Sequence, residues 1–93
     1  MSSRDWKIYV VECADASLYT GITTDVERRI REHNESDKGA RYTRSRRPVR
    51  LVACWSCDNR SQAARLEYAF KALRRPEKMT WIEREDIAAL LDE

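Results

Sequence analysis

The 93-residue sequence has no long apolar run, and none approaches the roughly 18 residues that a membrane-spanning helix requires. It also begins without the basic and apolar segments of a secretory signal peptide. We therefore expect a cytoplasmic protein with no membrane partner. There is no internal repeat, low-complexity segment or linker, and the length suits one domain. We expect that domain to span residues 1–93, with a core at about 5–80 and a C-terminal helix at about 81–92.

Cysteines are few, and their number is odd. Cys13, Cys54 and Cys57 are the three present, which argues against a disulfide framework in a chain without a secretory signal. Cys54 and Cys57 form a Cys-x-x-Cys pair that, together with Cys13 and His33, would make four zinc ligands on paper. The pair falls in an apolar, strand-like run, however, and residues three apart in a strand point to opposite faces. We therefore expect free thiols.

Acidic residues are absent from one segment of the chain. Residues 38–50 hold six basic residues and no acid, whereas the rest of the chain holds 12 basic and all 16 acidic residues, a net charge of −4. One basic segment on an acidic body is the pattern expected for binding to a polyanion such as nucleic acid. A solvated, arginine-rich loop with no partner is the alternative.

Apolar patterning predicts three strands and three helices, in the order β-β-α-β-α-α, and hence a small sheet covered by helices. A capping box at Thr24–Glu27 begins the first helix, and Asp58 or Asn59 caps the second. Pro76 either interrupts the second helix or starts another. A further capping box at Thr80–Glu83 leads into the last helix. The strands are expected at residues 6–13, 17–22 and 49–57, and the helices at about 25–34, 61–74 and 81–92, with a basic loop at 35–48.

The loop of the first hairpin decides whether two tyrosines share one face of the sheet. Because side chains alternate along a strand, a three-residue loop at 14–16 pairs Tyr9 with Gly21 and brings Tyr19 to the same face. A four-residue loop separates the two tyrosines, and a five-residue loop restores the shared face. The three-residue loop needs a left-handed residue at its end, where this chain has Ala16 instead of glycine, at a cost of roughly 1 kcal/mol.

Several side chains of the hairpin and the first helix suit the hydrolysis of a phosphodiester. A tyrosine acts as a base only where nearby cations or a metal lower its pKa. Arg29 can provide that charge and can also bind two phosphate oxygens. Arg29 and His33 lie four residues apart and project from one face of the helix. Packing of that helix on the sheet would aim both groups at Tyr9 and Tyr19.

A lone carboxylate, Glu67, lies beside the apolar stripe of the second helix and four residues before Lys71. One carboxylate, with waters and a substrate phosphate, suits Mg²⁺ or Mn²⁺. The sequence has no Asp-x-Asp motif, so we expect a single divalent ion. A plain ion pair between Glu67 and Lys71 is the alternative.

These residues occur in the order found in the GIY-YIG nucleases. The two tyrosine triplets are Lys7-Ile8-Tyr9 and Tyr19-Thr20-Gly21, with nine residues between them. Over about residues 5–80 the chain resembles small stand-alone bacterial GIY-YIG proteins, which are similar to the excinuclease C nuclease domain and to the catalytic subunit of a eukaryotic structure-specific endonuclease. Lys7 replaces the glycine of the first triplet, and Thr20 the isoleucine of the second. The similarity is strongest over residues 13–21, 25–34 and 38–44.

The resemblance implies an α+β fold with a three-stranded antiparallel sheet, and a metal-dependent DNA endonuclease that is structure-specific or acts in repair. Tyr9 would be the base. Arg29 would bind the phosphate, Glu67 would bind the metal ion, and Tyr19 and His33 would assist. Gly21 would be structural. The substrate would be DNA, branched or single-stranded, and a partner protein would supply specificity. We expect six residues to bind the DNA backbone or to stack on an exposed base: Lys38, Arg41, Tyr42, Arg44, Arg46 and Arg47.

Two other classes of function remain open at this point. The first is a non-catalytic nucleic-acid-binding module, or a nuclease subunit that needs a partner, with salt-dependent binding and no metal requirement. The second is a protein-interaction domain whose basic loop meets an acidic partner.

Overall fold

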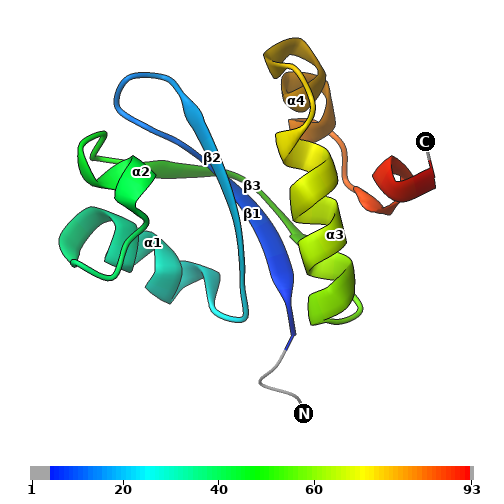
Figure 1. Cartoon of the computed structure of the whole chain (residues 1–93), viewed down its shortest axis with the longest axis horizontal. Coiled ribbons are helices and arrows are strands. Elements are labelled where there is room, and N and C mark those ends of the chain that lie inside the picture. The colour runs from blue at the N-terminus through cyan, green and yellow to red at the C-terminus, as the bar shows by residue number, and fades with distance from the viewer. Residues whose placement is uncertain (1–4, 93) are drawn as a thin grey trace.

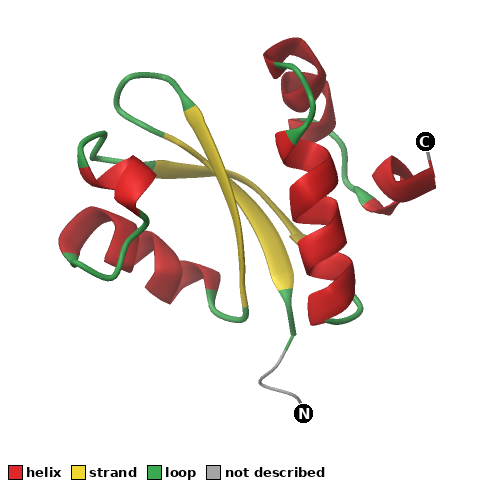
Figure 2. Ribbon diagram, viewed as in Figure 1, coloured by secondary structure: helices red, strands yellow, loops and turns green. Residues whose placement is uncertain are grey.

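The computed structural model describes residues 5–92 as a three-stranded sheet with helices on both sides (Figures 1 and 2). The strands lie in the order β2-β1-β3, and both neighbouring pairs are antiparallel, which confirms the expected α+β class and sheet. Figure 1 shows α1 and α2 on one side of the strands and α3 and α4 on the other. The elements are β1 Lys7–Glu12, β2 Leu18–Thr23, α1 Val26–Glu35, α2 Arg41–Arg44, β3 Arg50–Ser56, α3 Arg60–Lys71, α4 Arg75–Ile82 and the 3₁₀-helix η1 Ala88–Asp92.

The two faces of the sheet bury two separate apolar clusters, because the side chains of the central strand β1 alternate. Ile8 and Val10 point to the side of α3, where they meet a larger cluster that includes Leu66, Phe70 and Trp81. Tyr9 and Val11 point to the opposite side, with Cys13, Val49, Tyr19 and the α1 residues Val26 and Ile30. A tyrosine hydroxyl is thus carried into the smaller cluster, where polar partners are needed.

The first hairpin has the three-residue loop. Tyr9 pairs with Gly21 and Val11 with Tyr19, so both tyrosines lie on one face, as that loop length predicts. The Cys13 N–H donates to the Ser17 carbonyl at 2.8 Å and closes the loop. Ala16 accordingly takes the left-handed conformation, with φ of 70°. An alanine therefore occupies a position that favours glycine.

The first helix begins one residue later than the expected capping box. Asp25, not Thr24, is the N-cap, and its carboxylate accepts the Arg28 N–H at 3.0 Å. The Thr23 hydroxyl accepts the Asp25 N–H at 3.1 Å and so fixes the turn before the cap. The predicted box at Thr24–Glu27 is therefore wrong. The second helix expected from the sequence corresponds to α3. Its cap is Asn59, whose side chain accepts the Gln62 N–H at 2.8 Å.

The C-terminal region differs more from expectation. Pro76 lies in the first turn of a separate helix, α4, where a missing N–H is harmless. The predicted box at Thr80–Glu83 is wrong, because those residues form the end of α4, and the Thr80 hydroxyl donates back to the Pro76 carbonyl. The last helix is the short η1, which begins after Asp86 accepts the Ala88 N–H. None of the helices in residues 5–92 has the length and apolar character needed to cross a bilayer.

The expected basic loop contains a short helix, α2, so the observed element order is β-β-α-α-β-α-α. Gly39 lets this segment approach α1 closely: a Cβ there would lie 2.7 Å from both the Glu32 carbonyl oxygen and the His33 Cα. The Arg47 guanidinium donates to the carbonyls of His33 and Ser36 and so satisfies the C-terminal end of α1. These contacts hold α2 beside the hairpin tyrosines.

Candidate active site

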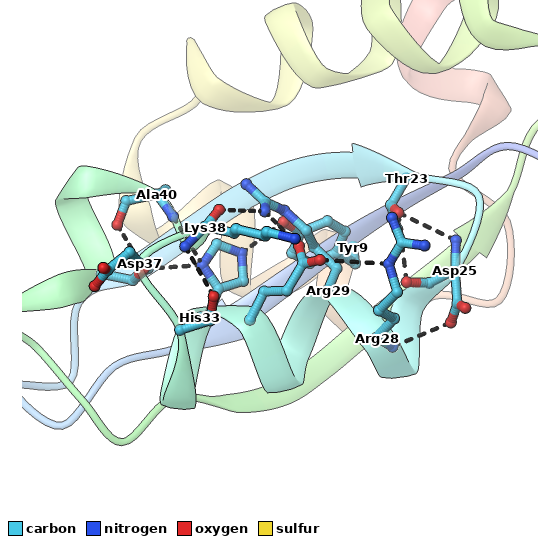
Figure 3. Close-up of polar contacts among 12 residues, drawn as sticks. Tyr9, Thr23, Asp25, Arg28, Arg29, His33, Asp37, Lys38 and Ala40 are labelled. Atoms are coloured by element: carbon cyan, nitrogen blue, oxygen red, sulfur yellow. Dashed lines mark hydrogen bonds and ion pairs between the residues drawn. The ribbon is translucent and has the colours of Figure 1, made fainter.

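Tyr9 is fully buried, and its phenol group meets His33 of α1 (Figure 3). The Tyr9 hydroxyl lies 2.8 Å from His33 Nε2, and His33 is also fully buried. Gly21 makes room for the phenol on the neighbouring strand, since a Cβ at Gly21 would stand 2.5 Å from the Tyr9 oxygen. The β1–β2 pairing and α1 together therefore fix one hydroxyl against one imidazole.

An aromatic group surrounds this pair on the side of β2. The Tyr19 ring meets His33 edge to face, with centroids 5.3 Å apart, and stacks on Tyr42 of α2 at 5.8 Å. The Arg46 guanidinium lies over the Tyr42 ring, 4.1 Å from its centroid. Tyr42 thus already contacts Tyr19 and Arg46 with its ring, although its side chain is partly exposed. A nucleobase can stack on Tyr42 only if it displaces one of these groups.

Arg29 lies next to Tyr9 on the same face of α1 as His33 (Figure 3). One of its terminal nitrogens donates to Glu32 Oε1 at 2.8 Å and to the Lys38 carbonyl at 2.7 Å. A guanidinium has five N–H donors, so these bonds leave others for a ligand. The expected approach of Arg29 and His33 to the hairpin tyrosines is what the geometry shows.

Burial shifts the two central titrations in opposite directions. It raises the pKa of Tyr9 to about 12, against the lowering effect of the Arg29 guanidinium beside it. It lowers the pKa of His33 to about 4, and the charge of Arg29 adds to that shift. At neutral pH the resting pair is therefore a neutral phenol and a neutral imidazole.

Glu67 approaches the site from α3, which packs against β1 and β2. Its carboxylate pairs with Lys71 at 3.2 Å, and the Lys71 ammonium lies 5.7 Å from the centroid of the Tyr19 ring. The ion pair that the sequence offered as an alternative is thus present, and it borders the tyrosines. The part of the chain that the structure describes has no cluster of three His, Cys, Asp or Glu residues suited to a metal. The donor set fits a hydrated Mg²⁺ or Mn²⁺ held by one carboxylate.

The expected nucleic-acid-binding residues divide into two kinds. Three of the arginines bond to their own chain: Arg44 to the Asp37 carbonyl, Arg46 to Asp15 and the Tyr42 carbonyl, and Arg47 to the end of α1. Lys38 and Arg41 are exposed, and their charged groups make no hydrogen bond or ion pair within residues 5–92. The latter two are the basic side chains available to a polyanion.

The three thiols do not gather around one point. Cys13 is buried, Cys54 is exposed on β3, and Cys57 follows the end of that strand half-buried. Burial raises the pKa of the Cys13 and Cys57 thiols, so neither is a ready thiolate at neutral pH.

Two residues of the site were not identified from the sequence as members of it. Thr43 of α2 is fully buried, and its hydroxyl lies 2.8 Å from His33 Nδ1. Lys71 was considered only as a helix partner of Glu67, although it also reaches the Tyr19 ring. For Lys71, its spacing from Glu67 was a usable signal. For Thr43 there was none, because a threonine within a basic, aperiodic segment carries no sign of burial.

A comparison with known families identifies the class of protein that this fold and site define. A family model for the GIY-YIG catalytic domain matches residues 5–80, and the chain therefore belongs to that family. Within it, the chain is similar to UPF0213 proteins. The one from Desulfotalea psychrophila is 58% identical over 77 residues, covering 83% of this chain and 70% of that protein. The one from Halobacterium salinarum is 54% identical over 71 residues, covering 76% and 91%.

Solved structures of relatives have the same fold. The solution structure of a UPF0213 protein from Bacillus halodurans is 49% identical, with a TM-score of 0.55 over 84% of this chain and 82% of that one. The solution structure of a protein from E. faecalis is 39% identical, with a TM-score of 0.61 over 86% and 84%. The family assignment makes nuclease chemistry the function to test.

Proposed function

We propose that this chain is a cytoplasmic, metal-dependent nuclease that hydrolyses phosphodiester bonds in DNA. The observation that carries the proposal is the buried hydrogen bond between Tyr9 and His33, with Arg29 beside the phenol. A hydroxyl and an imidazole in contact form a pair through which a proton can pass. The neighbouring guanidinium suits an anionic substrate such as a phosphodiester.

In the proposed mechanism Tyr9 takes a proton from the attacking water. Arg29 binds the scissile phosphate with the donors that Glu32 and Lys38 leave unused, and it stabilises the charge that develops there. Tyr19 packs against His33 and keeps the imidazole in place. Burial keeps the pKa of Tyr9 high in the folded protein, so its hydroxyl is protonated before the reaction. We infer that this proton moves to His33 as the proton of the attacking water arrives.

Glu67 is the proposed ligand for a single Mg²⁺ or Mn²⁺ ion. The ion would supply charge neutralisation at the phosphate. The Glu67 carboxylate would hold the ion, and Lys71, which pairs with Glu67 Oε2 and lies near the Tyr19 ring, would add a second positive charge beside it. A half-exposed pair of this kind is weak enough to open.

The class of substrate follows from the family resemblance and from the exposed charge. The proposed relation to the excinuclease C nuclease domain and to a eukaryotic structure-specific endonuclease rests on the motif resemblance, and it favours branched or single-stranded DNA and a role in repair. Lys38 and Arg41 are placed to contact its backbone. A partner protein that contributes specificity belongs to the same proposal.

The second candidate is a non-catalytic nucleic-acid-binding module, or a nuclease subunit that needs a partner. The ion pair between Glu67 and Lys71 favours it, because the carboxylate is satisfied without a metal. This candidate predicts DNA binding that does not respond to divalent ions.

The deciding experiment incubates the protein with labelled branched, flapped, single-stranded and duplex DNA, with Mg²⁺, Mn²⁺ or a chelator. Tyr9→Phe and Glu67→Ala should each reduce cleavage by at least about 100-fold and leave binding within about threefold. Glu85→Ala, at an exposed glutamate outside the site, is the matched control and should cleave like the wild type. Wild-type cleavage by Tyr9→Phe would refute the mechanism, and metal-independent binding without cleavage would favour the second candidate.

A further inference from the structure

The hydrogen bonds of Thr43 go beyond anchoring a helix. Thr43 is the fully buried residue of α2, and its hydroxyl oxygen lies 2.8 Å from His33 Nδ1. The same hydroxyl donates to the Ala40 carbonyl at 2.9 Å. Because the Thr43 hydroxyl is buried and makes both bonds, its roles as donor and as acceptor are fixed.

That direction determines which nitrogen of His33 carries the proton. A threonine hydroxyl has one hydrogen, and here the Ala40 carbonyl receives it. The oxygen must therefore accept from His33, so Nδ1 is protonated and Nε2 of the neutral ring is bare. The Tyr9 hydroxyl then donates to Nε2 at 2.8 Å.

In the opposite tautomer, the polar groups around His33 Nδ1 form poorer hydrogen bonds. If Thr43 donated to Nδ1, the Ala40 carbonyl would lose its bond from the hydroxyl at 2.9 Å and keep only the bond from the Thr43 N–H at 3.1 Å. The Ala40 N–H would then be the second donor near Nδ1, but it lies 3.4 Å away, at the long limit of a hydrogen bond. The 2.8 Å contact between Thr43 and Nδ1 is kept in either tautomer, so the choice rests on the hydroxyl bond to the Ala40 carbonyl at 2.9 Å, which is shorter than the Ala40 N–H contact and outweighs it.

We propose that Thr43 is a positioning residue that holds His33 as the Nδ1–H tautomer and so keeps Nε2 ready to accept the proton of Tyr9. Two further contacts support its placement. Gly39 lets the segment lie against α1, and Arg47 ties the segment to the His33 carbonyl. The tautomer stands on geometry alone, whereas its catalytic value rests on the proposed function.

In that function each transferred proton has a donor and an acceptor. A water O–H bond breaks and its proton joins the Tyr9 oxygen, while the former Tyr9 proton moves to His33 Nε2 and leaves an imidazolium. The water oxygen bonds to phosphorus, and the electron pair of the broken P–O bond stays on the leaving oxygen, which takes a proton from solvent. The imidazolium later returns its proton to solvent through Tyr9. In the opposite tautomer Nε2 already carries a proton, so it cannot accept the proton of Tyr9.

Nitrogen NMR of the ring tests the tautomer directly, because His33 is the single histidine of the chain. At pH 7 in the wild type, Nδ1 should resonate as a protonated nitrogen and Nε2 as an unprotonated one. The reverse pattern would overturn the proposal without any variant and whether or not the protein cleaves DNA. Absence of cleavage with the expected tautomer would refute the proposed function alone.

Variants then test the role of the hydroxyl. Thr43→Val keeps the shape but removes the hydroxyl, and it should mix the two tautomers and lower kcat about 10- to 100-fold with little change in KM. Thr43→Ser should restore both the wild-type tautomer and the rate. Thr80→Val, which removes an exposed hydroxyl on α4, is the matched control and should change neither. If Thr43→Val retains the wild-type tautomer, or mixes the tautomers while retaining the wild-type rate, Thr43 does not position His33 for catalysis.

Discussion

At the scale of single residues, the site depends on one missing side chain. Gly21 faces Tyr9 across β1 and β2, and a Cβ there would meet both the phenol oxygen and the ring carbon that bears it. Tyr9 cannot swing aside easily, because it is fully buried and bonded to His33. Space at Gly21 is therefore a condition for the Tyr9–His33 contact.

We predict that Gly21→Ala destabilises the protein by about 1–3 kcal/mol, the range for overpacking a core, and reduces cleavage by weakening the Tyr9–His33 bond. Urea unfolding measures the first effect and single-turnover cleavage the second. The control is the same substitution in Tyr9→Phe, which lacks the oxygen that a Cβ meets first. Its additional loss of stability should be smaller, and an equal loss in both backgrounds would contradict a clash with the hydroxyl.

His33 should make stability depend on pH. Burial lowers its folded pKa to about 4 from an ordinary value of 6.5, so the unfolded chain takes up a proton first as pH falls. Stability is thus fully present above pH 6.5 and is lost between there and pH 4, by at most about 3 kcal/mol. His33→Gln should lack this component. Urea unfolding of both proteins across that range checks it, and parallel curves would contradict the prediction.

At the scale of elements, the basic residues of the segment 38–50 fall into two groups. Arg47 satisfies the end of α1, whereas Arg41 and Lys38 are exposed and make no such bonds within residues 5–92. Arg47→Ala should therefore destabilise the fold by about 1–2 kcal/mol. Arg41→Ala and Lys38→Ala should leave stability unchanged and each reduce the salt dependence of DNA affinity by about one phosphate contact.

Affinity titrations at several salt concentrations, together with urea unfolding, distinguish these effects. Arg50→Ala provides a comparison, because its exposed guanidinium pairs with Glu12 on the sheet edge. If Arg47→Ala lowered the salt dependence as much as Arg41→Ala without loss of stability, the division into structural and binding arginines would be wrong.

The same elements show which features of the fold can be predicted from sequence patterns. Alternation of side chains reduced the hairpin register to three alternatives, one for each loop length, and the sequence could not choose among them because the three-residue loop requires a left-handed Ala16. The helix α2 could not be predicted, because it is held by Gly39 and Arg47 through tertiary contacts, and not by an apolar stripe. The residues that fix the starts of α1 and η1 could not be predicted for a related reason: several polar residues in a row can accept the first N–H groups, and the surrounding turn selects Asp25 and Asp86.

At the scale of the whole molecule, β1 joins both halves of the fold. It pairs with β2 and β3 and contributes side chains to both apolar clusters. We propose that residues 1–93 act as one domain, and predict a single cooperative unfolding transition. Circular dichroism and the His33 ring signal should report the same urea midpoint. Two separate midpoints would show that one face of the sheet unfolds without the other.

The separation of the two clusters also has an optical consequence. Of the three tryptophans, Trp55 and Trp81 lie in the cluster on the α3 side, and Trp6 lies beside Arg60 of α3, whereas Tyr9 and Tyr19 lie in or against the other cluster. Indole emission therefore reports the packing of α3 and α4 and should be nearly insensitive to substitutions at the tyrosines. A strand bound only at the tyrosines should leave that emission unchanged, so a ligand that quenches it must also contact α3 or α4, which at the proposed site means Glu67 or Lys71.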